Sequence, residues 1–139
     1  MRAALLPPKT RITALKLHPD DLPPLNTVTA YGDGYVDINL QRHSGSVIIM
    51  PEQAVRAWPV ASFADLAAAH FEMLLEHAPE LVIFGSGAKL RFPHPKLTAA
   101  LAARRIGIET MDIQAACRTY NVLMAEGRKV AAALLIESA

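Results

Sequence analysis

The first half of the chain contains short apolar segments separated by turn residues. Residues 27–31 (TVTAY), 35–40 (YVDINL) and 46–50 (SVIIM) are rich in β-branched and aromatic residues and are divided by GDG and HSG. Such segments are typical of β-strands joined by tight turns. Between Val36 and Leu40, apolar and polar residues alternate, which indicates one buried and one solvent-facing side. The three segments therefore predict an antiparallel meander.

From residue 62 onward, helical patterns alternate with apolar strands. Residues 62–78 place apolar side chains at three- and four-residue steps behind a capping pair, Ser62 and Asp65. This pattern predicts a helix that Pro79 stops. Residues 81–84 (LVIF) are a continuous apolar run, as expected of a strand covered on both faces.

The remaining sequence repeats this alternation. A second helix is predicted from Pro95 to Arg105, with Gly107 supplying the left-handed residue that ends it. Three further elements complete the pattern, namely a strand over 108–111, a helix over 112–126 capped by Asp112, and a buried strand over 130–136.

The order of these elements predicts the fold class. Strands that alternate with helices favour an α/β domain with helices on both faces of a sheet. We therefore expect a single three-layer α/β domain with a mixed, largely parallel sheet, flanking helices and an N-terminal antiparallel β-meander. A chain of 139 residues fits one domain. We assign residues 1–25 to an N-terminal extension or edge segment and residues 26–139 to the α/β domain.

Composition narrows the classes of function. Apolar residues make up 52% of the chain and charged residues 19%, which is typical of a globular protein. The formal net charge of +1 provides no field for recruitment to nucleic acid or an anionic membrane, so we expect no nucleic-acid partner. The chain has no apolar run of about 18 residues, so no membrane span is predicted.

The single cysteine and the N-terminal sequence bear on location. One cysteine cannot form an internal disulfide, which favours a reducing setting, and we expect a cytoplasmic protein. The first 19 residues are basic, as in targeting peptides, but Pro7 and Pro8 interrupt their apolar run. We therefore expect neither a signal peptide nor a transit helix.

Several motifs closely resemble one protein family. GIETMD, AACRTYNVL and EGRKVAAALLIE, preceded by FGSG, are similar to the bacterial relatives of NADH:ubiquinone oxidoreductase complex assembly factor 3, a family of unknown function. The resemblance covers roughly residues 26–136. It implies a single three-layer α/β domain and, from the mitochondrial members, assembly through protein contacts. It implies no catalytic residues.

A candidate ligand site follows the strand at 81–84. In open α/β sheets, ligands bind beyond the carboxyl ends of the strands, and here the loop begins Gly85-Ser86-Gly87. Lys89 and Arg91 would add positive charge for a small anion. The glycines lack the spacing of a dinucleotide or P-loop motif, so the alternative is a tight turn with positive φ.

The predicted helix over 112–126 carries the other candidate residues. Gln114, Arg118 and Asn121 share one helical face, so Arg118 would clamp an anion and Asn121 would orient it. Asp112 at the helix start completes the candidate set. In the alternative, Arg118 pairs with a nearby carboxylate such as Glu109 or Asp112 and braces the fold.

The sequence contains no recognisable catalytic or metal-binding constellation. Cys117 lies on the apolar side of its helix without an evident histidine partner, which is typical of a small core residue. HEXXH is absent, and His70 and His77 are two helical turns apart, so neither metal nor cofactor is predicted.

Two classes of function remain. The favoured one is a non-catalytic protein-interaction or assembly-factor-like module that binds a protein partner or forms a homo-oligomer. We expect its contact surface near Trp58, Val60 and Phe63 as exposed residues. The alternative is a small-anion or metabolite-binding protein, or an uncharacterised enzyme, that uses the Gly85–Gly87 loop and Arg118.

Overall fold

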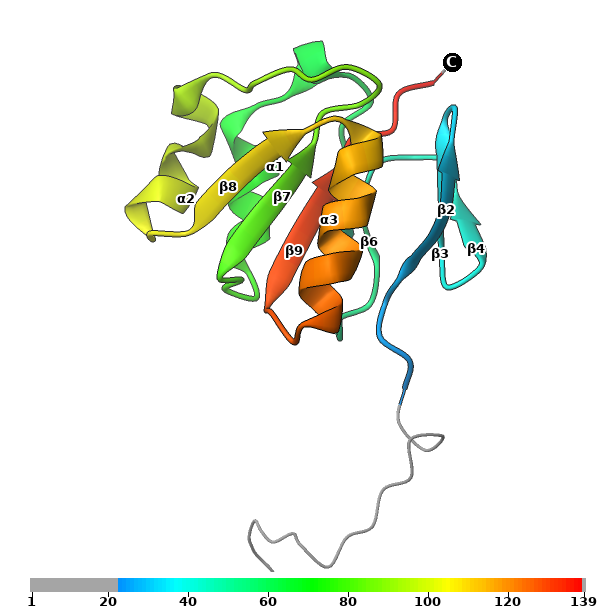
Figure 1. The fold of residues 1–139 in the computed structure, drawn as a ribbon. Helices are drawn as coiled ribbons and strands as arrows, with labels where there is room; N and C mark the ends of the chain where they lie inside the picture. The colour runs from blue at the N-terminus through cyan, green and yellow to red at the C-terminus, as the bar shows by residue number, and fades with distance from the viewer. Residues whose placement is uncertain (1–22, 139) are drawn as a thin grey trace, which may run out of the picture.

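The computed structural model of the chain describes residues 23–138 and contains two β-sheets (Figure 1). The N-terminal extension assigned to residues 1–25 therefore lies almost entirely outside the described residues. Within residues 23–138, no helix is long and apolar enough to cross a membrane.

The smaller sheet is an antiparallel meander of β2 (Val28–Gly32), β3 (Tyr35–Ile38) and β4 (Gln41–His43). The predicted meander is confirmed, and residues 46–50 do contain a strand, but the prediction that this strand belongs to the meander was wrong. Asn39 and Leu40 have positive φ angles of 50° and 70°, so the chain reverses immediately after β3 and β4 follows. Leu40, predicted to face the core, is 87% exposed at this turn.

The larger sheet has five strands in the order β6-β5-β9-β7-β8. These are β5 (Val47–Ile49), β6 (Arg56–Ala57), β7 (Leu81–Gly85), β8 (Gly107–Met111) and β9 (Val130–Leu134). β7 is parallel to both β8 and β9, whereas β5 is antiparallel to β9 and β6. All three residues of β5 are buried, because layers cover both faces of this sheet. This burial explains why residues 46–50 leave the meander.

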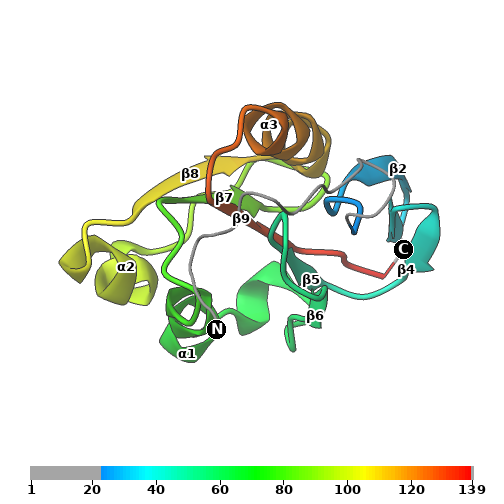
Figure 2. The same cartoon turned by 90° about the horizontal axis from the view of Figure 1, so that it is seen from below.

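Helices cover both faces of the larger sheet, and the predicted three-layer α/β architecture is confirmed (Figures 1 and 2). α3 (Ile113–Ala125) lies on one face, while α1 (Ala68–Glu72) and α2 (Ala99–Ala103) lie on the other. Alternate residues of the strands divide between two apolar clusters. Ile83 packs on the α3 side, whereas Val82 and Phe84 pack on the α1 and α2 side.

The helix predicted over 62–78 is divided into three short pieces. A 3-10 helix, η3 (Phe63–Asp65), precedes α1, and another, η4 (Met73–Leu75), follows it. The hydroxyl of Ser62 donates to the Asp65 carboxylate over 2.9 Å and caps no backbone N–H, so the predicted capping interaction was wrong.

The second predicted helix also starts as a 3-10 turn, η5 (Pro95–Thr98), before α2. Its left-handed end is formed by Arg105, with a φ of 57°, and not by Gly107, which is the first residue of β8. The third helix agrees more closely with prediction. A carboxylate oxygen of Asp112 accepts from Ala115 N over 2.9 Å, and Gly127 adopts a φ of 82° beyond the helix end.

The smaller sheet is attached to α3 through two adjacent side chains. The Tyr120 hydroxyl donates to the carbonyl of Asn26 over 2.8 Å. Asn121 donates its amide to the Val28 carbonyl over 2.8 Å and accepts from the Val28 N–H over 2.9 Å. Val28, Val36 and Ile38 then bury their side chains against the same apolar cluster as α3. Residues of α3 thus fix the position of the meander.

Candidate functional site

The loop after β7 starts at the rim where the parallel strands end. Gly85 is paired in register with Met111 of β8 and Leu134 of β9, so the carboxyl ends of all three strands lie together. α3 begins at the same rim, because Ile113 N donates to the Gly87 carbonyl over 2.8 Å. The glycine loop and the start of α3 therefore lie at the same rim of the sheet.

Ser86 is the organising residue of this loop and is fully buried. Its hydroxyl donates to the Lys89 carbonyl over 2.6 Å and accepts from Arg91 N over 2.9 Å. Its own N–H donates to the carbonyl of Met111 over 2.8 Å. The polar groups of Ser86 are therefore used to fold the loop and are not directed at a ligand.

Arg91 points back into the protein from the same loop. Its Nη2 donates to the carbonyl of Ser86 and to Oε1 of Glu137, each over 2.6 Å. Its guanidinium carbon lies 4.7 Å from the ring centroid of Phe63, a cation–π arrangement. Within the described residues its Nε is buried without a hydrogen-bond partner, which offsets part of the stabilisation. Arg91 thus connects the loop to η3 and to the segment after β9.

Glu137 completes this connection. Its second carboxylate oxygen accepts from the N–H of Phe63 over 2.9 Å. The hydrogen bond from Arg91 holds the pKa of Glu137 below its ordinary value of 4.5, with a further contribution from the Phe63 N–H. The carboxylate is therefore ionised at neutral pH and neutralises the arginine that was predicted to attract an anion.

The two glycines serve different structural purposes. Gly87 has a φ of 100°, so the predicted turn with positive φ is confirmed at this position. A Cβ at Gly85 would lie 3.0 Å from both the Ala116 Cβ and a methyl group of Leu134, so this glycine permits close packing between β7 and α3.

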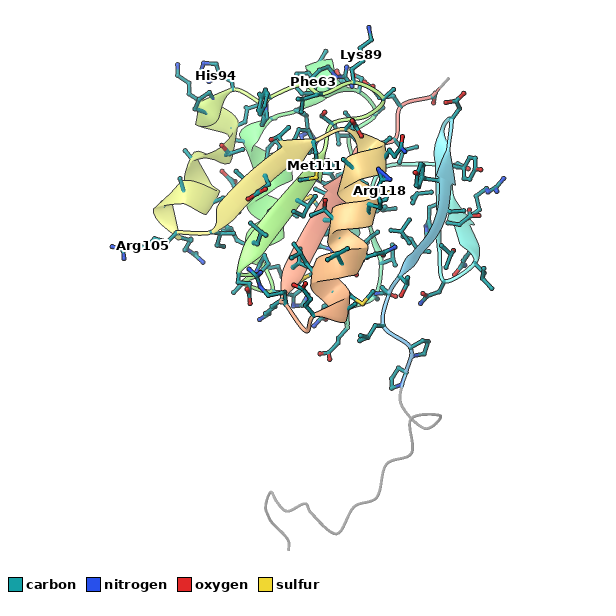
Figure 3. All side chains as sticks on the ribbon, in the orientation of Figure 1. Phe63, Lys89, His94, Arg105, Met111 and Arg118 are labelled. Carbon is teal, nitrogen blue, oxygen red and sulfur yellow. The ribbon has the colours of Figure 1, made fainter. Side chains whose placement is uncertain are left out.

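The polar residues of α3 diverge from the loop. Asp112 is engaged as the helix cap, and Asn121 is engaged with Val28 of the meander. Arg118 is exposed and projects from the side of α3 that faces β2 (Figure 3). The predicted brace between Arg118 and Glu109 or Asp112 is absent from the ion pairs formed within residues 23–138.

A groove of about 240 Å³ lies at the rim between the loop, the β2–β3 turn and the segment after β9. Its charged lining residues are Asp33 and Glu137, and neither Ser86 nor Arg118 contributes to it. None of the lining residues carries the positive charge that would attract a small anion. The groove is lined by Gly32, Asp33, Gly34, Gly87, Ala88, Ile113, Leu135, Ile136, Glu137 and Ser138.

The aromatic residues predicted to form an exposed contact surface are in the core instead. Trp58 is 2% exposed and Val60 is 6% exposed. The indole of Trp58 packs edge-on against Phe71 and Phe84, and its Nε1 donates to the His70 carbonyl over 2.9 Å. Phe63 is half-buried beneath Arg91. The apolar character that suggested an interface therefore reflects core packing.

Cys117 is a core residue, as predicted. The thiol is buried on the side of α3 that faces the sheet, and burial raises its pKa to about 12. A thiol with this pKa is protonated at neutral pH and is a poor nucleophile.

The exposed apolar residues of the loop were missed by sequence reasoning. Leu90 is 53% exposed and Phe92 is 70% exposed, whereas Arg91 between them turns inward. Lys89 extends away from the body along the edge that also carries His94 (Figure 3). The signal available in the sequence was a run of 28 residues, 81–108, without Asp or Glu, together with Pro93 and Pro95.

These features define the class of the protein. It is a three-layer α/β domain in which the polar residues at the rim of the sheet hydrogen-bond mainly to other groups of the same chain. Within it, the chain belongs to the protein family of unknown function DUF498/DUF598, whose family model matches residues 28–135. The resemblance identified from the sequence is thereby confirmed.

Relatives in this family include named eukaryotic proteins and solved bacterial structures. The chain is 32% identical over 129 residues to the Mus musculus protein NADH dehydrogenase (ubiquinone) 1 alpha subcomplex assembly factor 3, covering 91% of this chain and 68% of the relative. A crystal structure from Bordetella parapertussis has 45% identity and a TM-score of 0.77, covering 83% of this chain and 98% of that one. A solution structure from Bordetella pertussis, described as a Mth938-like domain, has 38% identity and a TM-score of 0.75, covering 89% and 94%.

Proposed function

We propose that the protein is a non-catalytic interaction module that assists the assembly of respiratory complex I. The observation that supports this most directly is the similarity to assembly factor 3 over 91% of the chain. The match extends over nearly the whole described domain, which supports a related role in protein contacts.

The geometry of the rim agrees with this function. Ser86, Arg91 and Asp112 are each engaged with other groups of the protein, and Arg118 projects elsewhere. A catalytic site requires polar groups that converge on a reacting atom. The predicted alternative, an anion or metabolite site that uses Gly85–Gly87, Lys89 and Arg118, has correspondingly less support.

The proposal includes a reducing, cytoplasmic setting, with which the single buried cysteine agrees. It also places the protein in contact with at least one protein partner, in preference to a homo-oligomer, because assembly factors act on other chains.

Affinity capture from the native cell tests the proposal. A tagged chromosomal copy is expected to recover subunits or assembly intermediates of complex I, and deletion of the gene is expected to reduce fully assembled complex I on native gels. The control is a strain that carries the same tag on an unrelated protein. Recovery of no stable protein companion, together with metabolite turnover by the purified protein, would overturn the proposal.

A further inference from the structure

We propose that the segment from Lys89 to Lys96 is the contact point for an acidic protein segment, with Phe92 as its apolar anchor. The proposal rests on the function proposed above and specifies the surface and the chemistry of the partner. We call this segment the docking loop.

The docking loop presents apolar side chains that the fold itself leaves uncovered. Leu90 and Phe92 are 53% and 70% exposed, although large apolar side chains of this kind are usually buried in a core. Arg91, which lies between them in the sequence, forms an ion pair with Glu137. The partly buried Arg91 side chain thus turns toward the protein, whereas the apolar side chains on either side of it face solvent. Exposed aromatic side chains of this kind commonly anchor protein interfaces.

The docking loop is also held in a fixed conformation before any partner binds. The hydroxyl of Ser86 restrains the first residues of the docking loop by hydrogen bonds to the Lys89 carbonyl and from the Arg91 N–H. Beyond Phe92, Nδ1 of His94 accepts from Lys96 N over 3.1 Å, and Pro93 and Pro95 restrict the backbone. A contact residue on such a loop loses little conformational entropy on binding.

Charge selects the partner. Residues 81–108 contain five Lys or Arg residues and no Asp or Glu, whereas the chain as a whole is nearly neutral. Of these five, Arg91 is neutralised internally by Glu137. Lys89 and Lys96 belong to the docking loop and are exposed, and neither forms an ion pair within residues 23–138, so they present positive charge beside Leu90 and Phe92. An apolar site bordered by carboxylates on the partner would complement this surface.

A protein segment fits the docking loop better than a lipid surface. Peripheral membrane attachment generally needs the apolar face of a whole helix or several basic residues acting together. The docking loop offers two apolar side chains and two lysines on a rigid backbone, which is the scale of a protein hot spot.

Site-specific photo-cross-linking in the native cell tests the assignment. Benzoylphenylalanine replaces Phe92 in the full chain, and the matched control carries it at Val122, which is 56% exposed on α3. We expect position 92 alone to cross-link to a protein segment rich in Asp and Glu around apolar residues. A cross-link only to lipid, to a second copy of this chain or to a segment without acidic excess would overturn the assignment.

The cross-linked segment, prepared as a synthetic peptide, then provides a quantitative test. Phe92→Ser is expected to weaken its binding by roughly tenfold or more, as at interface hot spots, and Lys89→Glu with Lys96→Glu by several-fold with a weaker dependence on salt. Val122→Ser should change binding less than about twofold. Unchanged binding in Phe92→Ser would show that the docking loop is not the contact.

The two proposals can fail separately. If capture recovers complex I subunits but position 92 forms no cross-link, the docking loop is wrong and the assembly function stands. If capture recovers no stable companion and the purified protein turns over a metabolite, the assembly function fails, and the docking loop then depends on the cross-link from position 92 alone.

Discussion

Asn121 and Val28 are joined by two hydrogen bonds that span 93 residues of sequence. The Asn121 side chain donates to the Val28 carbonyl and accepts from its N–H, so it occupies the place that a neighbouring strand would take beside β2. Through this pair, a helix of the main layer holds one end of the three-stranded meander.

Replacement of Asn121 tests this attachment. Asn121→Ala leaves the Val28 N–H and C=O without their partners, and we expect a loss of about 1–3 kcal/mol in the free energy of unfolding. Hydrogen exchange at the Val28 amide should accelerate more than exchange in β9. The matched control is Gln114→Ala, an exposed residue of the same helical face, which should stay within about 0.5 kcal/mol of the natural protein. Equal effects of the two substitutions would contradict the assigned role.

Replacement by alanine should destabilise the protein at Arg91 but hardly change its stability at Arg118. Arg91→Ala removes hydrogen bonds to Ser86 and Glu137, so we expect a loss of about 1–3 kcal/mol in urea-induced unfolding. Arg118→Ala removes an exposed side chain and should change stability by less than about 0.5 kcal/mol. A marked loss of stability in Arg118→Ala would instead support the alternative in which Arg118 pairs with a carboxylate and stabilises the fold.

The pKa of Glu137 predicts a pH-dependent contribution to stability. Because this pKa is lower in the folded state than its ordinary value of 4.5, the ionised carboxylate stabilises the fold above about pH 4.5. That contribution is lost as the pH falls through the lowered pKa. Glu137→Gln should therefore differ most from the natural protein near neutral pH, and the difference should narrow below pH 4.5.

Urea denaturation of both proteins from pH 3 to pH 7 measures this difference. Glu80, whose pKa is lowered by hydrogen bonds from Arg128 and the Lys129 N–H, is present in both proteins, so its contribution cancels in the comparison. A stability difference that is constant with pH would exclude the ion pair as its source.

Three glycines separate backbone strain from steric crowding. Gly45→Ala introduces neither, because nothing lies within 4 Å of its Cβ position, and stability should hardly change. Gly127→Ala forces alanine to adopt a φ of 82° but causes no crowding, so the free energy of unfolding should fall by about 1–2 kcal/mol. Gly87→Ala combines a φ of 100° with a Cβ 2.7 Å from Arg91 Nη2, so it should cost the most. Thermal unfolding of the three variants measures the order, and any other order would contradict this account.

Most of the larger sheet could be predicted from the sequence. The residues of β7 and β9 are almost entirely apolar, and this composition is typical of buried parallel strands. α3 carries an apolar stripe, a capping aspartate and a terminal glycine, so three independent signals agree.

Residues 46–50 could not be assigned from local pattern alone. Their apolar character fits a strand, but it does not specify which sheet the strand joins. The long-range pairing of Val47 with Leu134 decides this, and pairing across so many residues leaves no local signal.

The contacts of the candidate site residues could not be predicted for a related reason. Residue type identified Arg91 and Arg118 as possible anion ligands, but their roles depend on where Glu137 and β2 lie. Glu137 is 46 residues away from Arg91 in sequence, and no local sequence pattern near Arg91 predicts that the two form an ion pair. For the same reason, the exposure of Leu90 and Phe92 is visible only in the three-dimensional structure.

β9 is the final strand of the described chain, yet it lies at the centre of the five-stranded sheet, between β5 and β7. During synthesis, β5 and β7 therefore each keep one unpaired edge until residues 130–134 have emerged from the ribosome. Closure of the sheet is thus a late event in biosynthesis, and incomplete chains expose open strand edges to chaperones and proteases.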